Sequence, residues 1–393
     1  MPTEARRSVD DQPRSAARTV AVICDPEAAP AEIAGHLHRV LPGLLAQAYG
    51  ESETFDVCLH RERLPIGPQG DHQSVVEHAG RMKQERAWDA VVCVTDLPLR
   101  GERNESLVAD LSTDSGVAVL SLPAFGATRL RRRVTQVTVE ILRELMPAVS
   151  KRAPTNRPAL SLTDRDLPGP FRLVIPETSG IDAQVVASRG LWRQLVGMVR
   201  ANRPWRLWLG LRGGVVAALA FSIFWLINPM VWQLGINHSV YRLIVISLWV
   251  VAAMVVWLIF YHHLWVFGGD GETADRQQVV LFNASTVITL VLGVSIAFIG
   301  LLILNFFAAH LVLSDKVLAS NLGSSPSPTE FIKLCWMATA GASVVGALGT
   351  GFESEEDVRE AAYSQREAER HKQWSSGKDS ESESSSGDKD TRS

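Results

Sequence analysis

Short apolar runs alternate with longer amphipathic stretches in the first part of the chain. The apolar, β-prone runs are residues 19–25, 54–64, 88–98 and 116–125. Between them, and again over residues 127–146, apolar residues recur at helical spacing. Strands that alternate with helices predict an α/β domain over residues 19–146, built on a largely parallel sheet.

Long apolar segments replace this alternation in the second half of the chain. A helix needs about 20 mostly apolar residues to cross the hydrocarbon core of a bilayer. We therefore expect an all-α transmembrane four-helix region over residues 205–351. Its spans are expected at about 207–227, 243–263, 282–310 and 332–351. The third apolar segment is longer than one perpendicular span requires, so we expect it to tilt or to extend beyond the membrane.

Polar stretches separate and flank these two regions. Residues 1–18 are expected to be disordered, and residues 147–170, rich in Pro, Arg, Asp and Ser, to form a linker. Residues 171–204 are expected to form a hairpin and an amphipathic neck helix, which lies on the inner leaflet or passes movement between the domain and the membrane. For residues 352–393 we expect a charged helix and a disordered acidic tail.

Basic residues beside the apolar segments predict their orientation. Five arginines precede the first segment, whereas the following loop, residues 228–240, has no Lys or Arg. This bias places the N-terminal side in the cytosol, and an even number of spans returns the C-terminus there. The predicted location is the inner (plasma) membrane of a cell, with the lipid bilayer as the first partner.

Small residues recur every four positions along the first and fourth segments. The residues are Gly210, Gly214, Ala218 and Ser222 in the first segment, and Ala338, Ala342 and Gly346 in the fourth. Such stripes allow helix backbones to approach closely. We expect these two helices to touch, either within one protomer or in a homo-oligomer.

Composition and charge narrow the function classes. The 393 residues are 46% apolar and 21% charged, with a net charge of −3, so no basic field indicates nucleic acid. The four cysteines form no CxxC pair and lie in apolar runs. Buried free thiols in a reducing compartment are therefore expected.

Polar residues follow several predicted strands. Asp25, Thr95, Asp96 and Ser121 would gather at one edge of a parallel sheet, where they could hold Mg²⁺ or a phosphate-bearing ligand. The alternative is that they only cap strands and form turns. Arg129, Arg131, Arg132 and Arg133 open the last helix of the domain and could bind an anion or lipid headgroups, or form a solvated face.

Recognisable catalytic chemistry is missing. No GxGxxG or Walker A run follows the first strand, and no HExxH motif or other histidine spacing indicates a metal. We therefore name no catalytic residue, no metal ligand and no cofactor, and favour a protein that is not an enzyme. Asn305 and His310 are the main polar groups of the third apolar segment, where a transporter would need them; an interhelical hydrogen bond or an interfacial position is the alternative.

The runs VAVICD, WDAVVCVTDLPL and GVAVLSLPAFG, followed by C-terminal spans, resemble those of uncharacterised actinobacterial multi-pass membrane proteins with an N-terminal cytosolic α/β domain. That resemblance implies the same architecture and assigns no activity. Our leading hypothesis is a sensing, scaffolding or regulatory membrane protein whose cytosolic domain binds a ligand or a protein partner. The alternatives are a membrane-tethered enzyme acting on a phosphorylated or lipid-linked substrate, and a transporter subunit.

Overall fold

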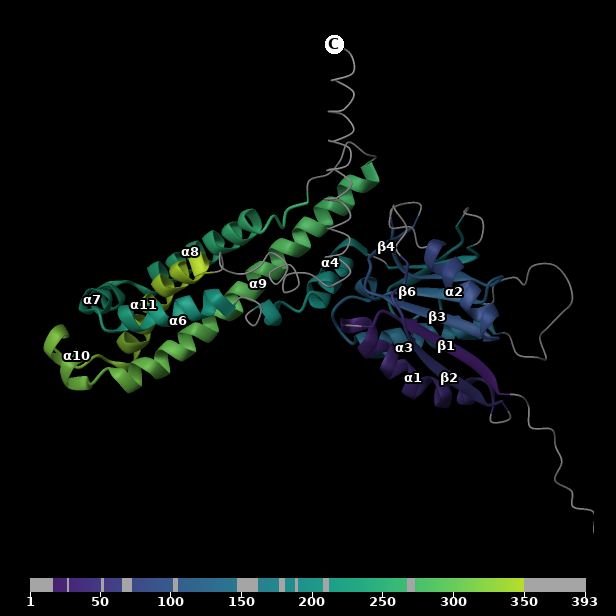
Figure 1. Ribbon diagram of the computed structural model, residues 1–393, viewed down its shortest axis with the longest axis horizontal. Helices are drawn as coiled ribbons and strands as arrows, with labels where there is room; N and C mark the ends of the chain where they lie inside the picture. Colours follow the sequence, from purple (N-terminus) through teal and green to yellow (C-terminus); the bar gives the residue numbers. More distant parts are fainter. Residues whose placement is uncertain are drawn as a thin grey trace, which may run out of the picture. The chain divides into compact units, whose positions relative to one another are not determined.

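The computed structural model divides the chain into two compact units, residues 1–190 and 191–393 (Figure 1). It describes residues 17–26, 28–50, 53–65, 73–101, 105–146, 162–176, 181–187, 190–207, 212–266 and 273–349. The predicted disordered N-terminus, most of the predicted linker, Gly210 and the predicted C-terminal helix and acidic tail lie outside the described residues.

The first unit is built on one eight-stranded mixed sheet. Its strands are β1 (Arg18–Cys24), β2 (Phe55–Arg61), β3 (Ala90–Thr95), β4 (Leu99–Arg100), β5 (Ser106–Ser112), β6 (Val117–Ser121), β7 (Phe171–Val174) and β8 (Ala183–Ala187). The order across the sheet is β2-β1-β3-β6-β5-β8-β7, and β4 pairs with β5. The first four strands of this order are parallel, and all pairings that involve β4, β5, β7 or β8 are antiparallel.

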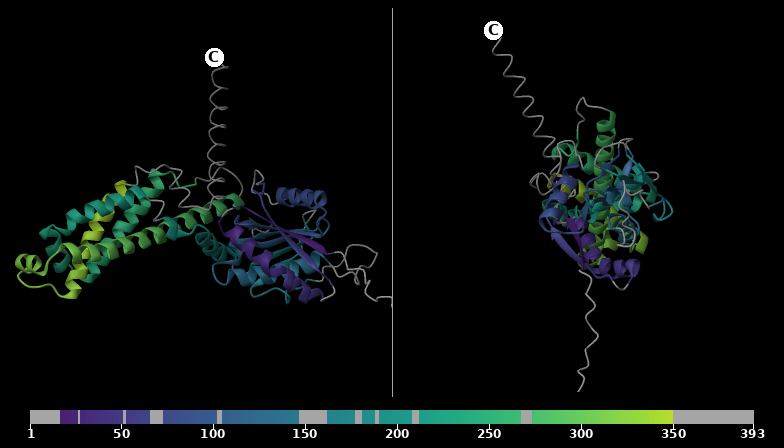
Figure 2. Two further views of the ribbon diagram at one scale, coloured as in Figure 1. Left: turned by 60° about the horizontal axis from the view of Figure 1, so that its bottom comes forward. Right: turned by 90° about the vertical axis from the view of Figure 1, so that its right-hand side faces the viewer.

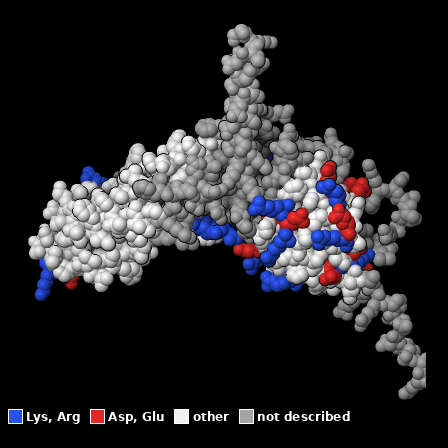
Figure 3. All heavy atoms as spheres, in the orientation of Figure 1, with Lys and Arg blue, Asp and Glu red and all other residues white. Residues whose placement is uncertain are grey.

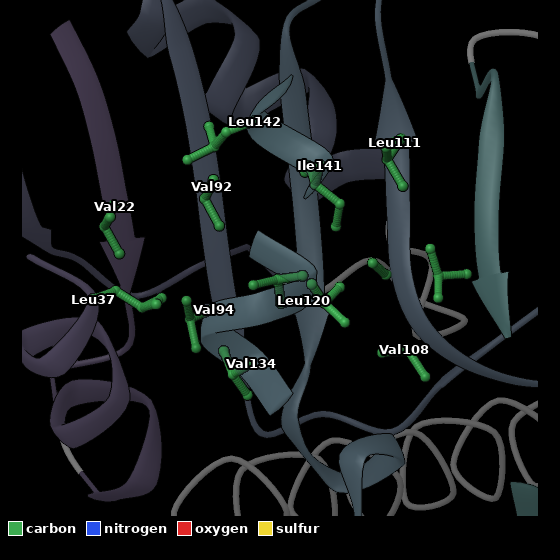
Figure 4. Packing of buried hydrophobic residues seen from close by; sticks show 14 of the residues in the cluster. Val22, Leu37, Val92, Val94, Val108, Leu111, Leu120, Val134, Ile141 and Leu142 are labelled. Carbon is green, nitrogen blue, oxygen red and sulfur yellow. The ribbon is translucent and has the colours of Figure 1, made fainter. Parts of the chain in front are cut away.

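Helices cover both faces of the parallel strands (Figure 2). Helices α1 (Ala28–Tyr49) and α3 (Leu130–Leu145) pack on one face, and α2 (Gln73–Glu85) packs on the other. Successive side chains of a strand point to opposite faces. Val22 and Val92 accordingly join the core under α1 and α3, together with Leu37 and Ile141 (Figure 4).

The sheet is less parallel and larger than the sequence predicts. The predicted α/β domain is confirmed, but β5 was not expected, and it brings an antiparallel half to the sheet. The predicted hairpin over residues 171–188 forms as β7 and β8, and it pairs with β5 rather than standing apart with the neck helix. Phe171 packs edge-on against Phe125, with ring centroids 5.5 Å apart, so the hairpin shares the core of the domain.

The second unit is helical. Its helices are α4 (Gly190–Ala201), the short η3 (Pro204–Arg206), α6 (Arg212–Leu226), α7 (Pro229–Asn237), α8 (Val240–Tyr261), α9 (Thr273–Val312), α10 (Asp315–Leu322) and α11 (Pro328–Gly349). Among the described helices, α8, residues 279–312 of α9, and α11 are long and apolar enough to cross a membrane. In the view of Figure 3, charged side chains are dispersed over the first unit, whereas the apolar helices show almost none.

The first predicted span ends in a sharp bend, and a second helix, α7, occupies most of the stretch 228–240 that was expected to be a loop. Helices α6 and α7 meet at 88° and would together count as a fourth span. Asn228 ends the first helix and caps the second, because its side-chain oxygen accepts a hydrogen bond from the Met230 N–H at 2.9 Å. Pro229 occupies the first turn of α7, where its missing N–H is not needed. Trp232 stabilises the bend by donating its indole N–H to the carbonyl of Leu226 at 2.6 Å.

The small-residue positions of α6 and α11 lie against each other. A Cβ added at Gly346 would lie 3.0 Å from the Cβ of Ala218 and 3.0 Å from the carbonyl oxygen of Gly214. A Cβ added at Gly349 would lie 2.6 Å from the Cβ of Ala217. The two helices therefore approach within one protomer to a distance that side chains at these glycines would prevent.

Candidate functional site

The strand order places Asp25 and Asp96 at the same end of two adjacent strands, β1 and β3. Asp25 follows β1 and Asp96 follows β3, and these strands are parallel neighbours. After β1 the chain crosses to β2, on one side of the pair, and after β3 it continues towards β6, on the other. This divergence is a topological switch point, at which open α/β sheets bind ligands beyond the carboxyl ends of the strands.

Thr95 and Ser121 complete this edge and bond to the chain that leaves β3. The Thr95 hydroxyl accepts a hydrogen bond from the Leu97 N–H at 3.1 Å. The Ser121 hydroxyl donates to the Leu97 carbonyl at 2.7 Å and accepts from the Leu99 N–H at 3.4 Å. Both side chains are buried, so they fix the path of residues 96–99.

Asp25 occupies the same edge and also bonds to the backbone. Its Oδ1 atom accepts a hydrogen bond from the Leu64 N–H, 3.3 Å away, just after β2. Asp25 and Asp96 are 5% and 4% exposed. The four predicted residues therefore lie along one sheet edge, and all four are buried there. Among the described residues, no group of three or more His, Cys, Asp or Glu side chains could hold a metal ion.

Two thiols lie next to this edge. Burial raises the pKa of Cys24 to about 11, and the neighbouring Asp25 carboxylate raises it further in the same direction. Burial also raises the pKa of Cys93, with the same carboxylate as the second cause. Because the thiolate is the reactive form, both cysteines are poor nucleophiles at neutral pH.

The four predicted arginines have separate environments at the start of α3. Arg129 precedes the helix in a left-handed conformation (φ 51°), and Arg131 and Arg132 are exposed. Arg133 instead donates a hydrogen bond to the Phe125 carbonyl at 3.2 Å. Burial, together with the guanidinium groups of Arg131 and Arg39, lowers the pKa of His36 on α1. The exposed cations therefore extend from α3 towards α1.

Apolar and polar contacts join α4, and the residue that follows it, to α9. Leu195 and Met198 pack against Leu281 and Phe282. One turn further along, the Asn202 side-chain amide donates to the hydroxyl of Thr289 at 3.2 Å and to that of Ser285 at 3.4 Å. Of the apolar face that predicted a helix on the lipid surface, Leu195 is thus covered by α9, whereas Leu191, Trp192 and Val196 are exposed. Residues Asn202, Ser285 and Thr289 were not singled out from the sequence, because the partner helix follows far along the chain.

The polar groups expected of a transporter have protein partners. Asn305 donates to the Thr339 hydroxyl, and His310 stacks on Phe306, with ring centroids 5.4 Å apart. Between α6, α8, α9 and α11 lies an apolar cavity of about 40 Å³, lined by residues such as Val251, Met254 and Phe298. These contacts and this lining are those of a packed helical bundle.

No protein-family model matches the chain, and comparisons with curated proteins and with solved structures found no significant match.

Proposed function

We propose that this chain is a sensing or regulatory membrane protein, whose cytosolic α/β domain binds a ligand at the β1/β3 switch point. The observation that carries the proposal is the position of Asp25 and Asp96, which follow the two strands that flank the switch point. Carboxylate and hydroxyl oxygens suit a hard cation such as Mg²⁺, alone or with a phosphorylated ligand.

The helical unit supports the membrane part of the proposal. We infer that α6 with α7, α8, α9 and α11 cross the plasma membrane as four spans, with both termini in the cytosol. Their apolar lengths and the arginines that precede α6 fit this placement.

Helix α4 supports a regulatory role over a simple anchor. Only Ser188 and Arg189 separate the end of β8 from Gly190, where α4 begins. Gly190 is the last residue of the first unit, where a Cβ added to it would lie 2.5 Å from the Cβ of Ser106 on β5; within the second unit, Leu195 and Met198 of α4 pack on α9. So short a connection can pass a displacement of β5 or β8 to α9.

The alternatives have less support from the geometry. A tethered enzyme needs a reactive nucleophile, whereas the hydroxyls of Thr95 and Ser121 are bonded to backbone and burial raises the pKa of Cys24. A transporter subunit needs polar groups that face a pathway, whereas Asn305 is bonded to Thr339.

Ligand-dependent thermal stabilisation of the full-length protein in lipid nanodiscs tests the proposal. The panel is Mg²⁺, Mn²⁺, nucleotides and phosphorylated metabolites. A ligand that binds only the folded state raises the melting temperature. We expect one member of the panel to do so, and the shift to disappear in Asp25→Asn and Asp96→Asn.

Asp114→Asn is the matched control, because Asp114 is exposed in the turn between β5 and β6, at the opposite edge of the sheet. It should keep the full shift. No shift with any ligand in the well-folded wild-type protein, or an equal loss in Asp114→Asn, would contradict a site at the switch point.

A further inference from the structure

Helices α1 and α3 form one outer layer of the first unit, and exposed arginines lie where the two helices adjoin. Both helices pack on the same face of the sheet (Figure 1). The α1/α3 basic surface consists of Arg39 on α1 and Arg129, Arg131 and Arg132 at the start of α3, all exposed. Burial lowers the pKa of His36 on α1, and the guanidinium groups of Arg131 and Arg39 lower it further. Cations from both helices therefore act on one residue, and the basic surface is continuous across them.

Carboxylates do not balance these cations. Residues 33–50, which include most of α1, and residues 116–139, which include the first part of α3, contain neither Asp nor Glu. Among the residues that the structure describes, the four arginines of the α1/α3 basic surface form no ion pair. Helix α2, on the other face of the sheet, carries two acidic and two basic residues, and Figure 3 shows the two signs intermingled there. The α1/α3 basic surface therefore presents a field of a single sign.

The arginines are spread over this surface and do not converge on one point. Arg131 and Arg132 are consecutive on a helix, so their side chains diverge by about 100°. Arg133, the next residue, is bonded to the carbonyl of Phe125, and Arg39 belongs to the other helix. A small anion is held by donors that point at it, whereas dispersed cations suit an extended anionic surface such as a lipid leaflet.

We propose that the α1/α3 basic surface docks on anionic lipid headgroups of the cytosolic leaflet. The proposal rests on the membrane placement of the helical unit given above, which tethers the domain to this leaflet and raises its effective concentration there. Each arginine near an anionic leaflet strengthens binding by about five-fold. The C-terminal end of the chain is a weaker anionic partner, because residues 375–393 hold five acidic but also three basic residues.

Fluorescence quenching by lipid headgroups tests this docking in nanodiscs. The full-length chain is used in a Cys58→Ser background, since Cys58 is the one native thiol that is not buried. Gln136→Cys carries a fluorescent label on α3, one turn after Arg132, and Gln84→Cys carries the same label on α2; both positions are exposed. The discs hold a lipid with a nitroxide on its headgroup, in phosphatidylcholine alone or in an equal mixture of phosphatidylcholine and phosphatidylglycerol.

The result expected is quenching of the label at Gln136→Cys in the discs with phosphatidylglycerol, and little quenching in the neutral discs or at Gln84→Cys. Salt at about 1 M should abolish the quenching, because the Debye length then falls to about 3 Å.

Two triple variants test whether the named arginines are responsible. Arg39→Gln, Arg131→Gln and Arg132→Gln together should lower the equilibrium constant for docking by about 100-fold. The matched control removes the same charge from exposed positions elsewhere in the first unit, through Arg81→Gln, Arg86→Gln and Arg165→Gln. This control should keep the quenching.

Three results would overturn the docking: an unquenched label at Gln136→Cys in the anionic discs, equal quenching in the neutral discs or at Gln84→Cys, and an equal loss in the two triple variants. Quenching that appears only after removal of residues 375–393 would assign the surface to the chain's own C-terminal end, and would also overturn it. A chain that does not enter nanodiscs refutes the membrane placement itself, whereas a chain that enters them and stays unquenched refutes only the docking.

Discussion

The side-chain amide of Asn305 on α9 donates a 2.9 Å hydrogen bond to the hydroxyl of Thr339 on α11, and both residues are buried. Thr339 in turn donates to the carbonyl of Cys335 on its own helix at 2.8 Å. Asn305 and Thr339 are therefore bonded to each other between two helices of the proposed membrane bundle. We expect this bond to contribute to the stability of the bundle.

A double-mutant cycle measures this contribution. Asn305→Leu and Thr339→Val should each destabilise the bundle, and the cycle should give an interaction free energy of about 0.6 kcal/mol, as for other hydrogen bonds between membrane helices. The measurement is unfolding in bicelles by SDS. Loss of a transport activity without loss of stability in Asn305→Leu would instead favour a transporter subunit.

The close packing of α6 and α11 predicts that a larger side chain at Gly349 destabilises the helical unit. Gly349→Ala adds a Cβ 2.6 Å from that of Ala217, so the helices must separate, at a cost of about 1–3 kcal/mol of unfolding free energy. Leu348→Ala on the same helix is the control, since Leu348 is 59% exposed. Equal stability of both variants in the same SDS titration would contradict the tight contact.

Ser121 offers a test of the strand edge that needs no ligand. Ser121→Ala leaves the Leu97 carbonyl without its 2.7 Å donor in a buried site, which should lower the free energy of unfolding by about 1–3 kcal/mol. Ser115→Ala should change it by less than about 0.5 kcal/mol, because the Ser115 hydroxyl makes only a 3.4 Å bond in a turn. Urea titration followed by circular dichroism measures both. An unchanged Ser121→Ala variant would show that the hydroxyl is not needed to hold the loop.

The hairpin is expected to be essential to the stability of the domain. Phe171→Ala removes a ring that is 2% exposed and packed on Phe125, so it should cost about 3–5 kcal/mol. Ile175→Ala, in the same segment but at a side chain that is 72% exposed, is the matched control. A fragment of residues 17–146 should likewise be far less stable than one of residues 17–187. Equal urea midpoints for the two fragments would contradict this expectation.

Cys24 predicts a loss of stability in alkali. Its pKa rises from the ordinary value of 9.0 to about 11, chiefly through burial. Between these values the unfolded thiol loses its proton while the folded thiol keeps it, so the unfolded state binds fewer protons and the free energy of unfolding falls as pH rises. The contribution is complete below pH 9 and is lost as pH rises through about 11.

Urea titrations at several alkaline pH values measure this fall in wild type and in Cys24→Ala. The variant should show a shallower dependence in the same window, because it lacks the titrating thiol. Identical dependence in the two proteins would assign the effect to other groups.

Local patterns predicted the coarse architecture well. The apolar runs of β1, β3 and β6 and the long apolar helices are visible in the sequence because each depends on its own residues. β5 escaped notice because Asp110 interrupts its apolar run, although that aspartate is fully buried. The pairing of β8 with β5 joins segments more than 70 residues apart, and no local pattern in either segment predicts it.

Part of the candidate site was predictable for the same reason. Asp25 and Asp96 stand directly after recognisable strands, so their shared edge follows from a parallel sheet. The sequence does not indicate that this edge is buried. Asp25 and Ser121 bond there to the backbone of Leu64 and Leu97, which lie far from them along the chain. Similarly, the apolar face of α4 does not indicate which of its residues contact α9; Leu195 does, whereas Trp192 is exposed.

The β7–β8 hairpin comes late in the chain, so the strands of the sheet become available for pairing in a fixed order during synthesis. Strands β1 to β6 leave the ribosome first, yet β5 stays without its second neighbour until residues 183–187 have emerged. Helix α6, the first helix of the proposed membrane bundle, begins only 25 residues after Ala187. The sheet is therefore closed at about the time when the membrane-insertion machinery receives its first apolar helix. Until then the growing chain carries an open strand edge, for which a chaperone or rapid membrane targeting would be the natural protection.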